Sequence, residues 1–298
     1  MTLKYHKMKI LTFLLAFCFF SFVKSDKPAY LLYDKDLKAV SYENMLKELS
    51  QADIVFFGEL HDNSLNHWLE LQVTKDLFQV KKEKLILGAE MFESDNQTVM
   101  DEYMKSLITA KQFETEAQVW QNYQTDYKPL LDFAQQNKLK FIATNIPRRY
   151  ASMVSKGGLE ALNQLSDDAK KNIAPLPIEV DLTLPAYAEM MKMGGMHGSG
   201  GMSMSAENIT KAQIIKDATM ASFILRNYDS GRTFLHYNGR YHSNNFEGIV
   251  WHLKKKNPKL KIVTINTIQA QNITQPSEKE KNTADFIFAI PDDMTKSY

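Results

Sequence analysis

Two ionisable side chains, Glu59 and His61, directly follow an apolar run, and this pair is the first candidate for chemistry. On an extended segment residues i and i+2 point to the same side, so the carboxylate and the imidazole would face one space. With a second carboxylate at Glu90, which follows another apolar run, the set could bind a divalent metal or share a proton. The alternative is structural: Asp62 or Asn63 would cap the following helix, and Glu59 would pair with a lysine.

Amide and cationic side chains follow two further apolar runs in the same manner. Asn145 is followed by Arg148, and Asn238 is followed by His242. Pro147 suits the first turn of a helix, which would place Arg148 beside backbone N–H groups that favour a bound carboxylate or phosphate. An ion pair with an acid at the same edge is the alternative. In an open α/β sheet ligands bind outside the carboxyl ends of the strands, so we expect all four runs to deliver polar groups to one cleft.

These side chains can meet only if the apolar runs are neighbouring parallel strands. The strand-like runs cover residues 53–58, 84–92, 139–145, 232–239, 260–267 and 285–290. Helix-like stretches cover 63–80, 95–111, 113–137, 147–155, 159–172, 206–228 and 244–256. Short apolar strands that alternate with helices predict an α/β fold with a mainly parallel, twisted sheet flanked by helices. The long intervals around 95–137 and 147–228 predict a helical subdomain inserted beside the sheet.

The first 25 residues predict a signal peptide. Lysines precede an apolar run over 10–23 that is too short to span a bilayer, and small residues suited to cleavage lead to Ser25. We therefore expect an exported protein, periplasmic or associated with the cell envelope, whose single mature domain covers 26–298. An uncleaved anchor is the alternative. Lipoprotein anchoring is disfavoured because Phe17 is too bulky for the position before a lipidated Cys18.

Charge and cysteine content exclude two classes of function. The chain has 36 Lys and Arg residues against 35 Asp and Glu residues, and the leader removes lysines but no acid. A slightly acidic mature chain lacks the basic patch that nucleic-acid binding requires. Cys18 is the only cysteine and leaves with the leader, which excludes disulfide bonds and thiolate catalysis in the mature domain.

The stretch 189–205 (EMMKMGGMHGSGGMSMS) differs in kind from its surroundings. It is rich in Gly, Met and Ser and predicts a mobile loop. Its methionines and His197 could offer soft ligands to Cu(I) or contact a flat apolar ligand. The alternative is a flexible linker without a ligand.

One helix is expected to turn polar groups toward the cleft. Gln213 and Asp217 share a helical stripe with the apolar Met220 and Ile224. Two polar residues continuous with an apolar stripe indicate a buried hydrogen-bonding role. His67, by contrast, lies within an earlier helix and is expected to be structural.

Several segments together resemble ChaN-type haem-binding proteins. They are GELHDNSLNHWLELQ (58–72), GAEMF (88–92), WQNYQTDYKPLLDFAQQNKLKFIATNIPRR (120–149), KAQIIKDATMASFI (211–224) and YNGRYHSNNFEGI (237–249). They occur in the order of that family, whose members are exported, often iron-regulated proteins. The family is grouped distantly with the Tiki metalloproteases and the erythromycin esterases.

The resemblance implies a haem site in a cleft between the sheet and a helical side domain. It implies haem-linked dimerisation with two stacked haems, and a receptor or transporter of a haem or iron uptake system as partner. Carried over by motif, the residues that line the cleft are Glu59, His61, Glu90, Asn145, Arg148, Asn238 and His242. Tyr187 and His197 are candidates for the axial haem ligand, as are Tyr123 and Tyr127.

A metal-dependent hydrolase of the Tiki type is the alternative function. His61, Glu90 and His242 would then hold a divalent metal that activates water, with Glu59 beside it. A third reading is an interaction module with a vestigial site, but it does not explain four polar strand ends. We favour the haem-binding function, without turnover.

Overall fold

The computed structural model describes residues 27–196 and 205–298. The expected signal peptide and His197 lie outside the described residues. Within the described part, none of the helices is both long and apolar enough to cross a membrane.

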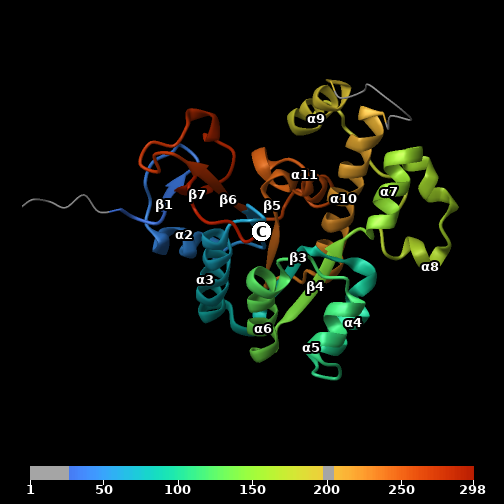
Figure 1. Cartoon of the computed structure of the whole chain (residues 1–298), viewed down its shortest axis with the longest axis horizontal. Coiled ribbons are helices and arrows are strands. Elements are labelled where there is room, and N and C mark those ends of the chain that lie inside the picture. The colour runs from blue at the N-terminus through green and yellow to red at the C-terminus, as the bar shows by residue number, and fades with distance from the viewer. Residues whose placement is uncertain (1–26, 197–204) are drawn as a thin grey trace, which may run out of the picture.

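A seven-stranded, mostly parallel sheet forms the centre of the molecule (Figure 1). Its strands are β1 (Leu31–Asp34), β2 (Ile54–Glu59), β3 (Leu85–Glu93), β4 (Lys140–Asn145), β5 (Thr233–Gly239), β6 (Ile262–Ala270) and β7 (Phe286–Pro291). The strand order is β1-β7-β6-β2-β5-β3-β4, and only the edge strand β1 is antiparallel to its neighbour. The six predicted strands and the α/β fold class are confirmed.

Helices cover both faces of the sheet. One face carries α2 (Tyr42–Leu49), α3 (Ser64–Lys81), α4 (Gln97–Met104), α5 (Ala110–Glu116) and α6 (Lys128–Gln136). The other carries α10 (Ala206–Asn227) and α11 (Ile249–Lys256), with α7 (Arg148–Gly157), α8 (Asp167–Lys170) and α9 (Pro185–Met196) around α10. The helices of 95–137 and those of 147–228 thus lie on opposite faces.

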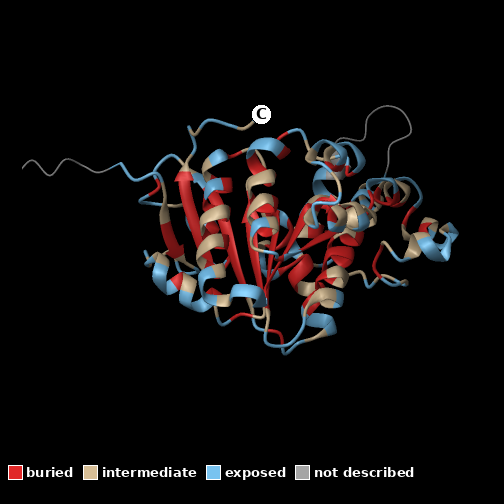
Figure 2. Cartoon of the chain, turned by 90° about the horizontal axis from the view of Figure 1, so that it is seen from below, coloured by how far each residue is buried: buried red, intermediate tan, exposed pale blue. Residues whose placement is uncertain are grey.

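Two hydrophobic cores sandwich the central strands (Figure 2). Val55 and Phe57 of β2 belong to the core under α3, whereas Ile54 and Phe56 belong to the core under α10. Every residue of β2 and β5 is buried. This double coverage explains why these strands read as nearly continuous apolar runs, since successive side chains point to opposite faces.

Three predicted helices are divided in the structure. The stretch 95–111 is helical only over α4 and the start of α5. The stretch 113–137 is interrupted because Gln118 has a positive φ of 48° after α5 and Pro129 occupies the first turn of α6. The stretch 159–172 forms a 3-10 helix over Leu159–Gln164 and then α8, which begins after the capping side chain of Ser166.

The Met-rich stretch is also different from its prediction as a loop. Its first part, 189–196, belongs to α9. Glu, Met and Lys are good helix formers and outweigh the two glycines there. The remainder, 197–204, lies outside the described residues.

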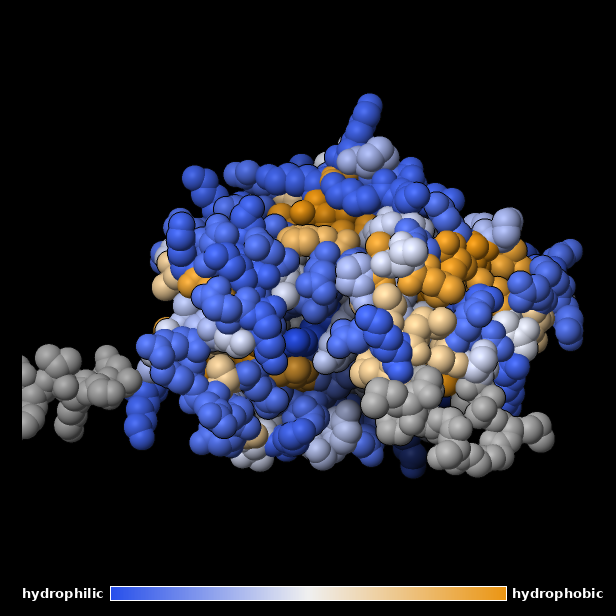
Figure 3. Space-filling model, turned by 90° about the horizontal axis from the view of Figure 1, so that it is seen from above, coloured by the Kyte–Doolittle hydropathy of each residue, from blue (hydrophilic) through white to orange (hydrophobic). Residues whose placement is uncertain are grey.

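The surface reflects this division of the fold. Seen from above, hydrophobic residues gather mainly over the half of the molecule that holds α7 to α10, whereas hydrophilic residues dominate on the side of β1 (Figure 3). On those helices a pocket of about 370 Å³ is lined largely by apolar side chains such as Pro177, Ile178, Ala221 and Leu225.

The start of α3 is fixed by a side-chain cap, as the structural alternative for Asn63 predicted. Asn63 Oδ1 accepts hydrogen bonds from the backbone N–H groups of Leu65 and Asn66, at 3.1 and 3.0 Å. Asn63 is fully buried. This cap sets the direction in which α3 leaves the loop that carries His61.

We expect Asn63→Ala to lower the free energy of unfolding by about 1–2 kcal/mol, because the first turn of α3 loses its acceptor. Urea unfolding measures the change. Ser41→Ala, which removes the exposed cap of α2, is the matched control and should cost less. Equal losses in the two variants would contradict a special role for the buried cap.

Candidate functional site

The carboxyl ends of β2, β5 and β3 lie next to one another and bring the predicted residues together. β5 lies between β2 and β3, with Glu59 in register with Gly239. Glu90 reaches across from β3, where its Oε2 accepts a hydrogen bond of 2.7 Å from the backbone N–H of Gly239. The neighbouring strands β2 and β5 both lead into the pattern Gly-x-x-His, ending at His61 and His242. This repeated spacing is a sequence signal that our sequence analysis did not use.

His242 is held between two carboxylates. Its Nε2 lies 3.1 Å from Glu90 Oε1, and its Nδ1 lies 2.5 Å from Asp217 Oδ1. Burial alone would lower the pKa of His242, but the charges of Glu90 and Asp217 raise it to about 10. Burial would likewise raise the pKa of Glu90, but the positive charge of His242 lowers it well below its usual range. The site therefore contains a buried imidazolium with both nitrogens occupied.

The helix α10 supplies the polar groups that its sequence stripe predicted. The side-chain amide of Gln213 lies 3.0 Å from the ring nitrogens of His242, and Asp217 pairs with the same ring. The hydroxyl of Tyr187, from α9, donates to Asp217 Oδ2 at 2.7 Å. Tyr187 is buried, so it supports Asp217 from behind.

Among the described residues, no group forms a hydrogen bond with the Nε2 of His61, whose ring lines the cleft. Its Nδ1 lies 2.6 Å from Glu59 Oε1, an oxygen that also accepts a 2.7 Å hydrogen bond from the Tyr127 hydroxyl. The side chain of His61 is 36% exposed. Its Nε2 lies against Gly239, where an added Cβ would come within 2.6 Å of it. The glycine thus lets the imidazole ring pack directly on the end of β5.

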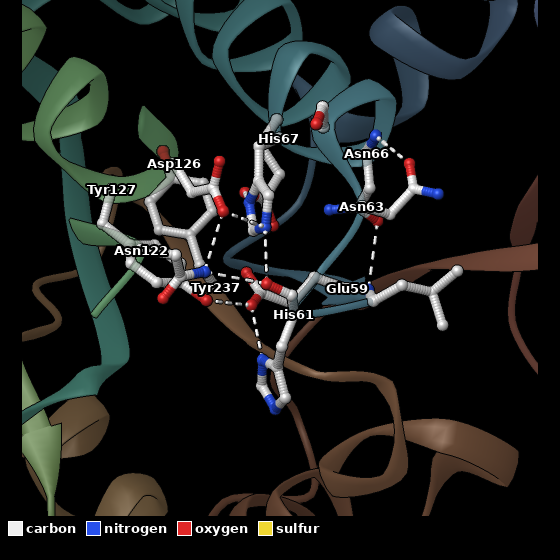
Figure 4. A network of polar contacts seen from close by, with 12 residues as sticks. Glu59, His61, Asn63, Asn66, His67, Asn122, Asp126, Tyr127 and Tyr237 are labelled. Carbon is white, nitrogen blue, oxygen red and sulfur yellow. Dashed lines mark hydrogen bonds and ion pairs between the residues drawn. The ribbon is translucent and has the colours of Figure 1, made fainter. Parts of the chain in front are cut away.

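A buried polar network lies behind Glu59 (Figure 4). His67 Nδ1 bonds Glu70 Oε2 at 2.9 Å, and His67 Nε2 lies 3.5 Å from Asp126 Oδ2. Burial, followed by the nearby charge of Glu70, raises the pKa of Glu59 to about 8. Burial raises the pKa of Glu70 to about 8 as well. In contrast to Glu90, these acids lack a strongly basic partner.

Potential metal ligands converge in this network rather than in the cleft. Among the described residues, the one group of three whose ligand atoms all lie within 4.8 Å consists of Glu59, His67 and Glu70. The set predicted from sequence, His61, Glu90 and His242, does not form such a group.

The cleft has two lobes, which share His61 and His242. The first has a volume of about 470 Å³ and is lined by Met190 and Met193 of α9 and by Tyr241. The second has a volume of about 530 Å³ and is mainly polar; its lining includes Glu93, Trp120, Asn145, Arg148 and Lys216. Both volumes fall within the roughly 300–1,000 Å³ of small-molecule and cofactor sites.

The other predicted residues take different positions. Asn145 lines the polar lobe and bonds the Glu90 carbonyl at 3.0 Å, and the exposed Arg148 lines the same lobe. Asn238 is fully buried and bonds Ser243 Oγ at 3.1 Å, so it shapes the turn that carries His242. Tyr123 is buried in the core under α3.

Four residues of the site and of the network behind it were not predicted from the sequence: Glu70, Asp126, Lys216 and Tyr241. Glu70 lies three residues after His67 on α3, a spacing that places both on one face of a helix. That spacing is the signal that could have identified the pair.

The fold and the cleft define an α/β protein with a polar cleft at the carboxyl ends of a mostly parallel sheet. The chain belongs to the family described as haem-binding uptake, Tiki superfamily, ChaN, whose model matches residues 45–253.

Solved structures share this fold. ChaN of Campylobacter jejuni, solved with cofacially bound haem, is 19% identical with a TM-score of 0.67; the match covers 87% of this chain and 96% of that protein. A Bacillus cereus protein is 12% identical with a TM-score of 0.50, over 89% and 96% of the two chains. A succinoglycan biosynthesis protein is 9% identical with a TM-score of 0.50, over 85% and 91%. No curated protein sequence matches the chain.

We expect His242→Gln to reduce the pH dependence of stability. The folded-state pKa of about 10 exceeds the ordinary value of 6.5, so the stabilisation is complete below pH 6.5 and is lost as the pH rises toward 10. Between pH 7 and 9 the unfolding free energy of the wild type should therefore fall more steeply than that of the variant, by up to about 1.4 kcal/mol per pH unit.

Urea unfolding at pH 7, 8 and 9 measures these slopes. The contributions of Glu59 and Glu70 are common to both proteins and cancel in the comparison. Parallel pH profiles would show that His242 is not protonated in the folded protein.

Proposed function

We propose that this protein binds haem in the two-lobed cleft and serves a haem or iron uptake system after export to the periplasm or cell envelope. Membership of the haem-binding uptake family supports the ligand class. The shared fold with a ChaN protein solved with cofacial haem supports the same ligand, and the location in the cleft rests on its volume and lining.

The free Nε2 of His61 is the observation that carries the proposal. Glu59 binds the Nδ1 of this ring and thereby fixes its orientation, the usual arrangement of a metal-ligating histidine. The ring lines both lobes, and a rotation that moves Nε2 away from Gly239, against which it lies, would let it serve a haem iron placed between them. His242 is poorly suited to this role because both its nitrogens are bound to carboxylates.

The two lobes offer the surroundings that haem requires. Met190, Met193 and Tyr241 supply apolar and aromatic contacts for a flat macrocycle. Arg148 and Lys216 in the polar lobe supply positive charge for the propionates. Tyr187 is a less suitable axial ligand than His61, since its hydroxyl already donates to Asp217.

A haem-linked homodimer, with a receptor or transporter as partner, belongs to the same proposal. Tyr241, which lines the first lobe, is 72% exposed, and Phe246, which follows Asn245 of the same lobe, is 38% exposed. Exposed aromatic side chains beside a ligand site are typical of contact surfaces.

We expect haem titration of the chain from Asp26 onward to saturate at one haem per chain, with a shift to dimer in size exclusion. His61→Ala should abolish the Soret shift of the bound state because the axial nitrogen is lost. His242→Gln is the matched control: it removes the other cleft histidine and should retain the axial ligation spectrum. His197→Ala and Tyr187→Phe test the remaining axial candidates.

The hydrolase alternative has its own outcome. If haem does not saturate the protein, and a divalent metal instead persists through purification and is lost in His61→Ala, the cleft is a metal-hydrolase site. Retention of the full Soret shift in His61→Ala would place the axial ligand elsewhere.

A further inference from the structure

Three buried side chains behind His61 offer ligand atoms to a single point. Glu59 comes from β2, and His67 and Glu70 come from α3. They are 1%, 5% and 0% exposed, and their ligand atoms lie within 4.8 Å of one another. Two ligands bound to one tetrahedral Zn²⁺ at about 2.1 Å lie about 3.4 Å apart. The group therefore needs to contract by up to about 1.4 Å to bind an ion.

Among the described residues, one oxygen of each glutamate carboxyl group accepts no hydrogen bond. Glu59 Oε2 and Glu70 Oε1 are both buried and unpaired. The opposite oxygens are occupied, by His61 and Tyr127 on Glu59 and by His67 on Glu70. A buried polar atom without a partner destabilises the folded protein. The two carboxyl groups lie within hydrogen-bonding reach of each other, so the free oxygens require either a shared proton or a cation between them.

The charged groups around these three residues also favour a bound cation. Asp126 adds a third buried carboxyl group, 3.5 Å from the His67 ring. Within the described ranges, the ion pairs of these three acids involve histidines and no lysine or arginine. Buried carboxylates are generally paired with cations or coordinate a metal.

We propose that Glu59, His67 and Glu70 bind one divalent transition-metal ion in a closed site behind the cleft. His67 Nε2 donates a hydrogen bond of 3.1 Å to the His61 carbonyl, so Nδ1, which now bonds Glu70 Oε2, is the nitrogen that would bind the ion. One imidazole nitrogen and two carboxylate oxygens suit Zn²⁺, Mn²⁺ or Fe²⁺. Glu59 also bonds the His61 ring through its other oxygen, so the ion holds the ligand face of the cleft in place. This site goes beyond haem binding and differs from the open set of His61, Glu90 and His242.

Zn²⁺ binding to the chain from Asp26 onward tests the site. Equilibrium dialysis should give one fewer Zn²⁺ per chain, or at least tenfold weaker binding of that ion, in Glu70→Gln than in the wild type. Glu90→Gln is the matched control, since it changes the cleft carboxylate near His61 and should keep this ion. Loss of the ion in Glu90→Gln with retention in Glu70→Gln would overturn the proposal.

Zinc K-edge absorption of the wild-type protein gives a second measurement that needs no variant. A single imidazole with oxygen ligands supports the buried site. Two imidazoles would place the ion between His61 and His242, and no retained Zn²⁺ would mean that protons alone neutralise the network; either result contradicts the proposal.

Haem titration of the same variants separates the two proposals. Glu70→Gln should lose the ion while it still binds haem, because neither lobe of the cleft includes Glu70. Zn²⁺ binding without haem binding would refute only the proposed function.

Discussion

The hydrogen bond from the backbone N–H of Gly239 to Glu90 is the contact on which the geometry of the cleft depends. It joins the ends of β5 and β3 at the point where the chain turns toward His242. The same carboxylate binds the His242 ring through its other oxygen. Because Gly239 has no side chain, the His61 ring can lie against it from the other side. One glycine and one carboxylate thus bring the two histidines to a shared wall between the lobes.

The two strand-end glutamates show how surroundings determine charge. Glu90 is buried beside the His242 imidazolium and a backbone N–H, so it remains ionised. Glu59 is buried beside the acid Glu70, and burial together with that neighbouring charge raises its pKa to about 8. Desolvation acts on both groups in the same direction, and only the neighbouring charge separates them. Carboxyl groups of one site whose pKa values are shifted in opposite directions recur at functional sites.

Much of this arrangement could be predicted from sequence, and the limits have physical causes. The double-covered strands leave long apolar runs, so their polar ends, Glu59 and Glu90 among them, could be assigned to one edge. Asp217 could be predicted to be buried because a helix repeats every 3.6 residues. The approach of Glu70 to Glu59 could not be predicted from the sequence, because it depends on how closely α3 packs against β2. The π-helical turn Tyr123–Tyr127, which delivers Tyr127 and Asp126, likewise leaves no periodic pattern.

His61 joins two polar regions. On the cleft side, the His242 imidazolium lies between two carboxylates, those of Glu90 and Asp217. The polar lobe offers Arg148 and Lys216 to the carboxylates of a ligand, beside the acid Glu93. On the inner side, the acids around Glu59 favour a cation or protons. The His61–Glu59 hydrogen bond connects the two regions, so a change of charge in the inner network alters the basicity of the His61 imidazole.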